Sequence, residues 1–190
     1  MPLLLYSSGT VSVFALEVAA AASRSESRQL QQQARAELLA AVLPGYIISH
    51  TPEGAPICTL PDSGAAASRL PSISITHCPT LVAVAIDTSG RAIGLDAEPL
   101  SRAAQLRRVL PKFLSDKQIS SLPDRESATL TAAWTAKEAL YKLLSASGDP
   151  RVSPSLADLP LTPPLPYASR LLTHADTLLT LIFTLTPNYQ

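Results

Sequence analysis

The sequence has little of several features that would point to particular classes of protein. Two cysteines among 190 residues are too few for a disulfide framework, so we expect a reduced, cytoplasmic setting. Fifteen Lys and Arg residues balance fifteen Asp and Glu residues. The absence of a basic excess argues against nucleic-acid binding, which needs a basic footprint. No apolar run has the length that would span a membrane, so we expect no membrane association.

The first residues, MPLLLYSSGTVSVFALEVAAAAS, have the apolar run and the small residues of a signal peptide. They lack the basic start of such a signal, and Glu17 interrupts the apolar stretch. We therefore expect these residues to remain part of a cytoplasmic protein.

The composition, 46% hydrophobic and 16% charged, is that of a globular protein. In the first half of the chain, apolar–polar alternation and helical spacing predict strands, a long helix from about Ser23 to Leu43 and further strands. In the second half they predict a strand, a long helix that ends near Leu144 and a closing pair of strands around Asp176. This order predicts an α+β fold of two similar lobes, residues 1–86 and 87–190, each a small sheet packed on a long helix. Ser89-Gly90 is predicted to form a hairpin turn between the strands on either side of it. Two lobes in one chain favour a monomer.

The stretch Ile93–Glu98, read IGLDAE, alternates apolar and polar residues and is typical of a strand. The period of two in a strand sends Asp96 and Glu98 to the same side. Two carboxylates held side by side in a cleft repel each other unless a cation lies between them.

The stretch Trp134–Lys142, read WTAKEALYK, is typical of a helix. Glu138 and Lys142 are four residues apart and lie one above the other, with Lys137 nearby and Trp134 in the core. A carboxylate with two ammonium groups could hold a divalent metal together with phosphate oxygens. Such hard oxygen ligands suit Mg²⁺.

The pattern G-x-D-x-E, followed about forty residues later by W-x-x-K-E-x-x-x-K, resembles the 4′-phosphopantetheinyl transferases of the surfactin-synthetase type. The resemblance implies transfer of the phosphopantetheine arm of coenzyme A to a serine of an acyl or peptidyl carrier protein, with release of adenosine 3′,5′-bisphosphate. It also implies two lobes in a pseudo-twofold arrangement, with the active site at their interface.

The resemblance assigns roles to particular side chains. Asp96, Glu98 and Glu138 are the implied Mg²⁺ ligands, and Asp96, Glu138 and Lys142 are the implied catalytic residues. Either Glu138 or a water on the metal would accept the proton of the serine. Lys142, Lys137 and His77 are implied to hold the phosphates of coenzyme A.

The same resemblance places the nucleotide end of coenzyme A. Arg24 and Arg28 correspond to basic residues that hold its 3′-phosphate, and Gly54 and Pro56 correspond to a loop that approaches its adenine. Two positions depart from the family pattern: Ala55 stands where a lysine is common, and Gln118 stands where a glutamate is usual.

Three alternatives stay open. The departures at Ala55 and Gln118 could mark a weakened relative that binds coenzyme A or a carrier protein without turnover. The motifs could belong to an unrelated Mg²⁺ enzyme acting on nucleotides. The acidic strand could also face solvent, and the Lys-Glu helix could be an ordinary surface with ion pairs.

Overall fold

A computed structural model describes residues 1–61, 70–149, 152 and 155–185. The first half of the chain forms β1 (Leu3–Ser8), β2 (Val11–Glu17), α1 (Arg24–Val42), β3 (Ile47–His50), β4 (Pro56–Thr59), β5 (Ser72–Cys78) and β6 (Leu81–Asp87). The second half forms β7 (Ile93–Pro99), the 3-10 helix η1 (Leu100–Arg102), α2 (Ala103–Arg108), α3 (Leu110–Phe113), α4 (Asp116–Ser121), α5 (Ser127–Ser147), the 3-10 helix η2 (Leu156–Asp158), β8 (Tyr167–His174) and β9 (Thr177–Thr184).

The first half builds a four-stranded antiparallel sheet in the order β1-β2-β6-β5. Helix α1 covers one face of it, where Leu38 packs with Val82 and Val84 in an apolar cluster. The helix begins where the sequence predicts, because the Ser23 side chain accepts a hydrogen bond from the backbone N–H of Glu26.

The second half builds a three-stranded antiparallel sheet in the order β7-β9-β8. Helix α5 covers one face of this sheet, where Leu140 and Leu143 pack with Ile182. The helix ends at Gly148, whose φ of 63° is the left-handed conformation that glycine adopts without strain. The predicted closing pair of strands is confirmed as the β8–β9 hairpin around Asp176.

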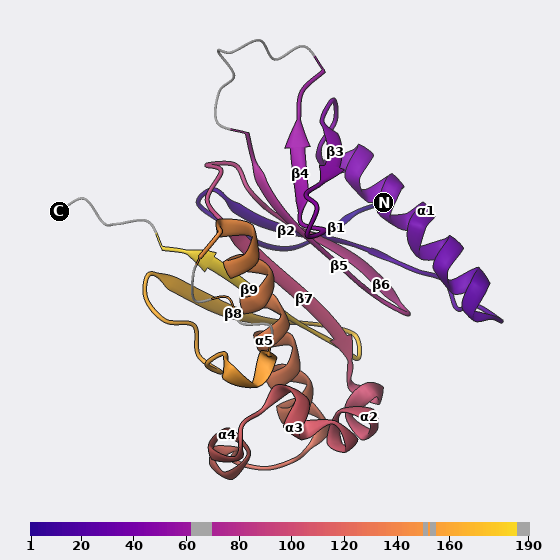
Figure 1. Cartoon of the computed structure of the whole chain (residues 1–190). Coiled ribbons are helices and arrows are strands. Elements are labelled where there is room, and N and C mark those ends of the chain that lie inside the picture. The colour runs from indigo at the N-terminus through magenta and orange to yellow at the C-terminus, as the bar shows by residue number, and fades with distance from the viewer. Residues whose placement is uncertain (62–69, 150–151, 153–154, 186–190) are drawn as a thin grey trace.

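The remaining faces of the two sheets share one core, in which Val13 and Ala83 of the first sheet lie with Leu95 and Leu181 of the second. The layers are therefore α1, the four-stranded sheet, the three-stranded sheet and α5 (Figure 1). The mixed fold of sheets on long helices is confirmed. If the β3–β4 hairpin and the short helices are left aside, both halves run strand, long helix, strand, strand, and the last strand lies in the middle, as β2-β6-β5 and β7-β9-β8. The pseudo-twofold arrangement of two lobes divided at 86 and 87 stays a prediction.

The predicted hairpin at Ser89-Gly90 is wrong. Strand β6 is already paired on both edges, with β2 and with β5, so it has no free edge for β7, which pairs with β9 instead. The turn leads from one sheet to the other. The Asp87 carboxylate stabilises it by accepting hydrogen bonds from the backbone N–H of Ser89 at 2.8 Å and from Arg91 Nε at 3.1 Å.

The two sheets meet along β5 and β7 through side chains. Ser74 Oγ accepts a hydrogen bond from the Leu95 N–H at 3.0 Å, and Thr76 Oγ1 accepts one from the Ala97 N–H at 3.2 Å. The contacts advance in the same direction along both strands. Hydroxyl groups thus satisfy backbone donors that a neighbouring strand would satisfy in a continuous sheet.

None of the described helices combines the length and the apolar composition that crossing a membrane requires. Cys58 and Cys78 are both buried, and neither forms a disulfide.

Candidate functional site

Strand β7 presents two different faces. Leu95 and Ala97 point into the core between the sheets, so the alternation turns Gly94, Asp96 and Glu98 toward α5. Helix α5 packs directly on this face: a Cβ added at Gly94 would lie 1.9 Å from the carbonyl oxygen of Ala139. The glycine of the G-x-D-x-E motif therefore lets the helix that carries Glu138 and Lys142 approach the acidic strand.

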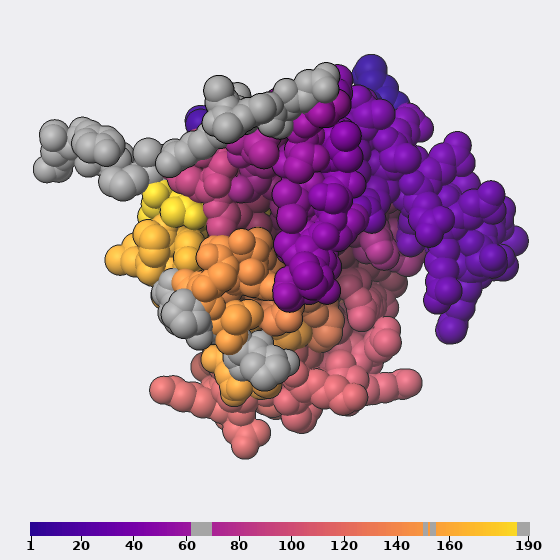
Figure 2. Space-filling model, turned by 45° about the horizontal axis from the view of Figure 1, so that its top comes forward, coloured from indigo at the N-terminus to yellow at the C-terminus, as the bar shows by residue number. Residues whose placement is uncertain are grey.

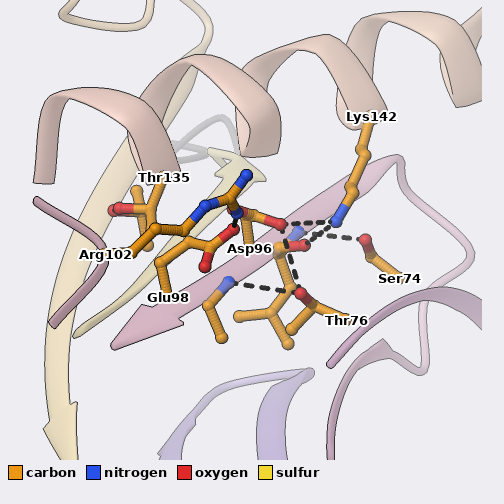
Figure 3. Close-up of polar contacts among 10 residues, drawn as sticks. Ser74, Thr76, Asp96, Glu98, Arg102, Thr135 and Lys142 are labelled. Atoms are coloured by element: carbon orange, nitrogen blue, oxygen red, sulfur yellow. Dashed lines mark hydrogen bonds and ion pairs between the residues drawn. The ribbon is translucent and has the colours of Figure 1, made fainter. Parts of the chain in front are cut away.

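The Asp96 carboxylate is held at one of its two oxygens (Figure 3). Its Oδ1 accepts hydrogen bonds from Lys142 Nζ at 2.8 Å and from Thr76 Oγ1 at 3.1 Å. Lys142 Nζ also donates to the Leu95 carbonyl at 3.0 Å. The other oxygen, Oδ2, is buried and has no hydrogen-bond partner. A buried carboxylate oxygen without a partner is costly, and it suits a site that is completed by a cation.

The charge of Glu98 is balanced by an ion pair with a residue outside the two sequence motifs. Its carboxylate forms an ion pair with Arg102, which follows the strand in η1. The Arg102 guanidinium lies 5.1 Å from the ring centroid of Trp134 on α5. Trp134 in turn meets Phe113 edge-on, so it packs in the apolar cluster, as predicted. Arg102 thus connects Glu98 on β7 to Trp134 on α5.

Glu138 lies on α5 close enough to Asp96 for mutual repulsion. Burial raises the pKa of Glu138, Asp96 raises it further, and the charges of Lys142 and Arg102 partly offset both effects. Two carboxylates and two cations thus share one electrostatic environment between β7 and α5. A divalent cation bound here would remove the repulsion that raises this pKa.

The oxygen donors are of the kind that Mg²⁺ prefers, and the unpartnered Asp96 Oδ2 fits a metal ligand. The part of the chain that the structure describes nevertheless contains no ready group of three acidic, histidine or cysteine side chains that could hold a metal ion. The reason is visible in the pairing, because Glu98 is turned to Arg102 and Asp96 to Lys142. The predicted metal set Asp96, Glu98 and Glu138 stays a prediction.

Lys137 does not reach this site, contrary to expectation. Its side chain is fully buried, and its ammonium donates to Gln118 Oε1 at 2.9 Å, to the Leu156 carbonyl at 2.9 Å and to the Leu159 carbonyl. Burial lowers the pKa of Lys137 to about 8, and Asp158 acts in the opposite direction. The helical rotation of one residue between Lys137 and Glu138 explains the difference, because it turns their side chains about 100° apart. Lys137 anchors η2 to α5.

Gln118 belongs to the same anchor. It closes a capping box at the start of α4, in which the Ser115 N–H donates to Gln118 Oε1 at 3.0 Å. Its Nε2 donates to the Leu159 carbonyl at 2.9 Å. At the position where the family usually has a glutamate, this chain therefore has a structural side chain bonded to the buried lysine.

The Gly54–Pro56 loop lies on the same cavity as Lys142. Gly54, Ala55, Pro56 and Lys142 line a cavity of about 130 Å³. A larger cavity of about 430 Å³ shares Ala55 and Pro56 with it and extends along the β3–β4 hairpin. In Figure 2 this hairpin (purple) adjoins the C-terminal end of α5 (orange), and residues 145–147 of that end line the larger cavity. The two cavities lie between the two halves of the chain.

His77, Arg24 and Arg28 are exposed and lie on the α1 side of the first sheet. His77 pairs with Val82, which packs toward α1, so the imidazole shares that face. Gln31 of α1 donates to the Cys78 carbonyl at 3.2 Å, and Arg28 lies three residues before Gln31. Arg28 and His77 thus lie toward the same end of β5, whereas Arg24 is one helical turn farther away.

Sequence reasoning missed two residues of the site, Thr76 and Arg102. The signal for Thr76 is the S-x-T alternation in Ser74–Thr76, which places two hydroxyls on one face of the strand. The signal for Arg102 is its spacing of four residues from Glu98. Pro99 between them disguised it, because a proline after a strand indicates a break and not a helical turn.

Comparison with known families gives an independent result for the second half of the chain. Residues 92–184 match the model of the 4′-phosphopantetheinyl transferase superfamily. A search of curated proteins found no match. The matched residues include β7, α5 and the β8–β9 hairpin, and hence Asp96, Glu98, Glu138 and Lys142. The resemblance seen in the two motifs is confirmed: residues 92–184 match the 4′-phosphopantetheinyl transferase superfamily, as both motifs predict.

Proposed function

We propose that this protein transfers the 4′-phosphopantetheine arm of coenzyme A to a serine of an acyl or peptidyl carrier protein in a Mg²⁺-dependent reaction. The observation that carries the proposal is the Asp96 carboxylate, which two donors hold at Oδ1 while Oδ2 stays buried without a partner. Glu138 lies close enough to share the electrostatic environment of Asp96, and Glu98 is two residues away on the same strand face.

In the proposed reaction the serine oxygen forms a bond to the phosphorus that carries the pantetheine arm, and the bond to adenosine 3′,5′-bisphosphate breaks. Asp96, Glu98 and Glu138 would hold Mg²⁺, which neutralises diphosphate charge when it is bound. Lys142, already paired with Asp96, is placed to stabilise negative charge on the leaving phosphate. Glu138 is the proposed acceptor of the serine proton, as a carboxylate that shares the site with Asp96 and Lys142.

The two cavities provide room for the donor between the halves of the chain. Gly54 and Pro56 bring backbone beside Lys142, where the adenine end of coenzyme A would enter. His77 and Arg28, at the end of β5, would take phosphate groups, with Arg24 one turn farther along α1. Lys137 has no part in the proposal, because its ammonium is already held by carbonyl groups.

The test is incubation with coenzyme A, Mg²⁺ and a generic apo carrier protein, with the carrier's gain of mass followed by mass spectrometry and adenosine 3′,5′-bisphosphate followed by chromatography. We expect transfer by the wild type and none by Asp96→Ala. Glu37→Ala, which removes an exposed carboxylate on α1, serves as the control and should transfer normally. Transfer by Asp96→Ala at the wild-type rate would show that the site is misassigned. Release of inorganic phosphate in place of the bisphosphate would favour a different Mg²⁺ enzyme acting on nucleotides.

A second candidate is a protein that binds coenzyme A or a carrier protein without turnover. It is favoured by Gln118, which stands where the family usually has a glutamate and which hydrogen-bonds to Ser115, Leu159 and Lys137. Saturable binding of coenzyme A by calorimetry, without product after long incubation with several carriers, would support this candidate over the enzyme.

A further inference from the structure

The Asp96 carboxylate is held in an unusual way for a buried acid. Its Oδ1 has two donors, and its buried Oδ2 has none. A carboxylate that could turn freely would share its donors between both oxygens, because an unpartnered buried oxygen costs free energy. The contacts that fix Oδ1 therefore also decide where Oδ2 points.

One of these contacts comes from the other half of the chain. Thr76 lies on β5, its side chain is buried, and its Oγ1 lies 3.1 Å from Asp96 Oδ1 and 3.2 Å from the Ala97 nitrogen. A hydroxyl has one proton to donate. Because the Ala97 N–H donates to Oγ1, that proton is directed to Asp96. The hydroxyl thus bonds to two consecutive residues of β7, to the Asp96 side chain as a donor and to the Ala97 backbone as an acceptor.

We propose that Thr76 is a positioning residue that turns Asp96 Oδ2 into the site, where it is available to a divalent cation. The identity of the ion rests on the proposed function; the geometry of the carboxylate does not. Lys142 holds the same oxygen with a charged group that is placed to meet the phosphates, whereas Thr76 is neutral, buried and outside the matched segment 92–184. Its part is to orient the carboxylate.

Ser74 provides a matched control on the same strand. Its hydroxyl accepts a hydrogen bond from the Leu95 N–H at 3.0 Å, as Thr76 accepts one from Ala97, but it does not bond to Asp96. Ser74→Ala therefore removes one hydroxyl contact between the sheets and leaves the carboxylate alone. Thr76→Val removes such a contact and also the donor to Asp96, while it keeps the branched shape of the side chain.

The experiment measures binding, not turnover. Mn²⁺ is titrated into the full-length protein with coenzyme A present and no carrier protein, and free Mn²⁺ is followed by electron paramagnetic resonance. We expect Thr76→Val to weaken Mn²⁺ binding by about tenfold, the loss typical when a group that orients a metal ligand is removed. Thr76→Ser should restore binding close to wild type, and Ser74→Ala should bind like wild type. Circular dichroism checks folding, and Thr76→Ala replaces the valine variant if that variant does not fold.

Equal losses in Thr76→Val and Ser74→Ala would overturn the proposal, because they would show a structural role for the contact between the sheets. Unchanged binding by Thr76→Val would overturn it as well, and so would a wild type that binds no Mn²⁺. The proposed function can fail separately: tight Mn²⁺ binding that depends on Thr76, without any transfer to a carrier, supports the positioning role and refutes the transferase.

Discussion

The ion pair between Asp96 and Lys142 gives the sharpest test of the site, and it does not depend on activity. The substitution Lys142→Met keeps an unbranched side chain on α5 but removes the ammonium group 2.8 Å from Asp96 Oδ1 and 3.0 Å from the Leu95 carbonyl. Asp96 is then left as a carboxylate whose one oxygen retains only Thr76 and whose other oxygen has no partner.

The magnitude follows from burial. Removing one partner of a buried ion pair costs about 3–5 kcal/mol because the other charge stays desolvated. Here the Asp96 side chain is 10% exposed but that of Lys142 is 31% exposed, so water reaches the pair and weakens it. We expect a loss of about 2–3 kcal/mol in the free energy of unfolding. For a protein of this size, that loss lowers the melting temperature by about 5–10 °C.

The double variant Asp96→Asn/Lys142→Met removes the unpaired charge and should recover at least about 1 kcal/mol relative to Lys142→Met alone. Urea denaturation followed by circular dichroism measures the wild type and both variants. Lys117→Met, at an exposed position of α4, controls for the loss of a lysine. If the single and double variants were equally stable, the carboxylate left by Lys142→Met would carry no desolvation cost, and the charge arrangement described for the site would be refuted.

The remaining predictions concern the elements around the site. Gly94→Ala should cost about 3 kcal/mol of stability in urea denaturation, because the new Cβ meets the Ala139 carbonyl and α5 must move; a change below 0.5 kcal/mol would contradict this packing. Lys137→Met should make the segment after residue 155 more sensitive to limited proteolysis, because the Lys137 ammonium anchors η2. Mn²⁺ binding should stay unchanged, because this ammonium does not face Asp96; weaker Mn²⁺ binding would show that Lys137 belongs to the site. The folded protein binds the Glu138 proton more tightly than the unfolded chain, so the stability from this group is complete below its ordinary pKa of 4.5 and is lost as the pH rises through the raised value. Thermal unfolding should accordingly show Glu138→Gln to be more stable than wild type at pH 7, with the difference vanishing in acid. Equal stability at pH 7 would show that folding does not raise the pKa of Glu138.

The local elements were predictable from the sequence. Ser23 marks the start of α1, and the alternation in Ile93–Glu98 places both carboxylates on the α5 face of β7. These predictions hold because capping and strand period depend on neighbouring residues alone. The glycine of the motif is now explained by the close approach of Ala139.

The rest depends on contacts between distant residues. The sequence around Ser89-Gly90 has the pattern of a hairpin, but the pairing of β6 was decided by β2 and β5. The direction of Lys137 was decided by the carbonyl groups of residues 156–159, which compete with any ligand for its ammonium. Thr76 escaped notice because its partner Asp96 lies twenty residues away in the other sheet.

The contact between the two sheets through Ser74 and Thr76 has a consequence for protein engineering. A continuous sheet would accept almost any sequence along its backbone ladder, but this joint is encoded in two side chains. A chimaera that grafts a foreign amino-terminal half onto residues 92–184 would keep every acidic residue of the motif. It would still need a hydroxyl side chain at the place of Thr76, or Asp96 on β7 would lose the contact that orients its carboxylate.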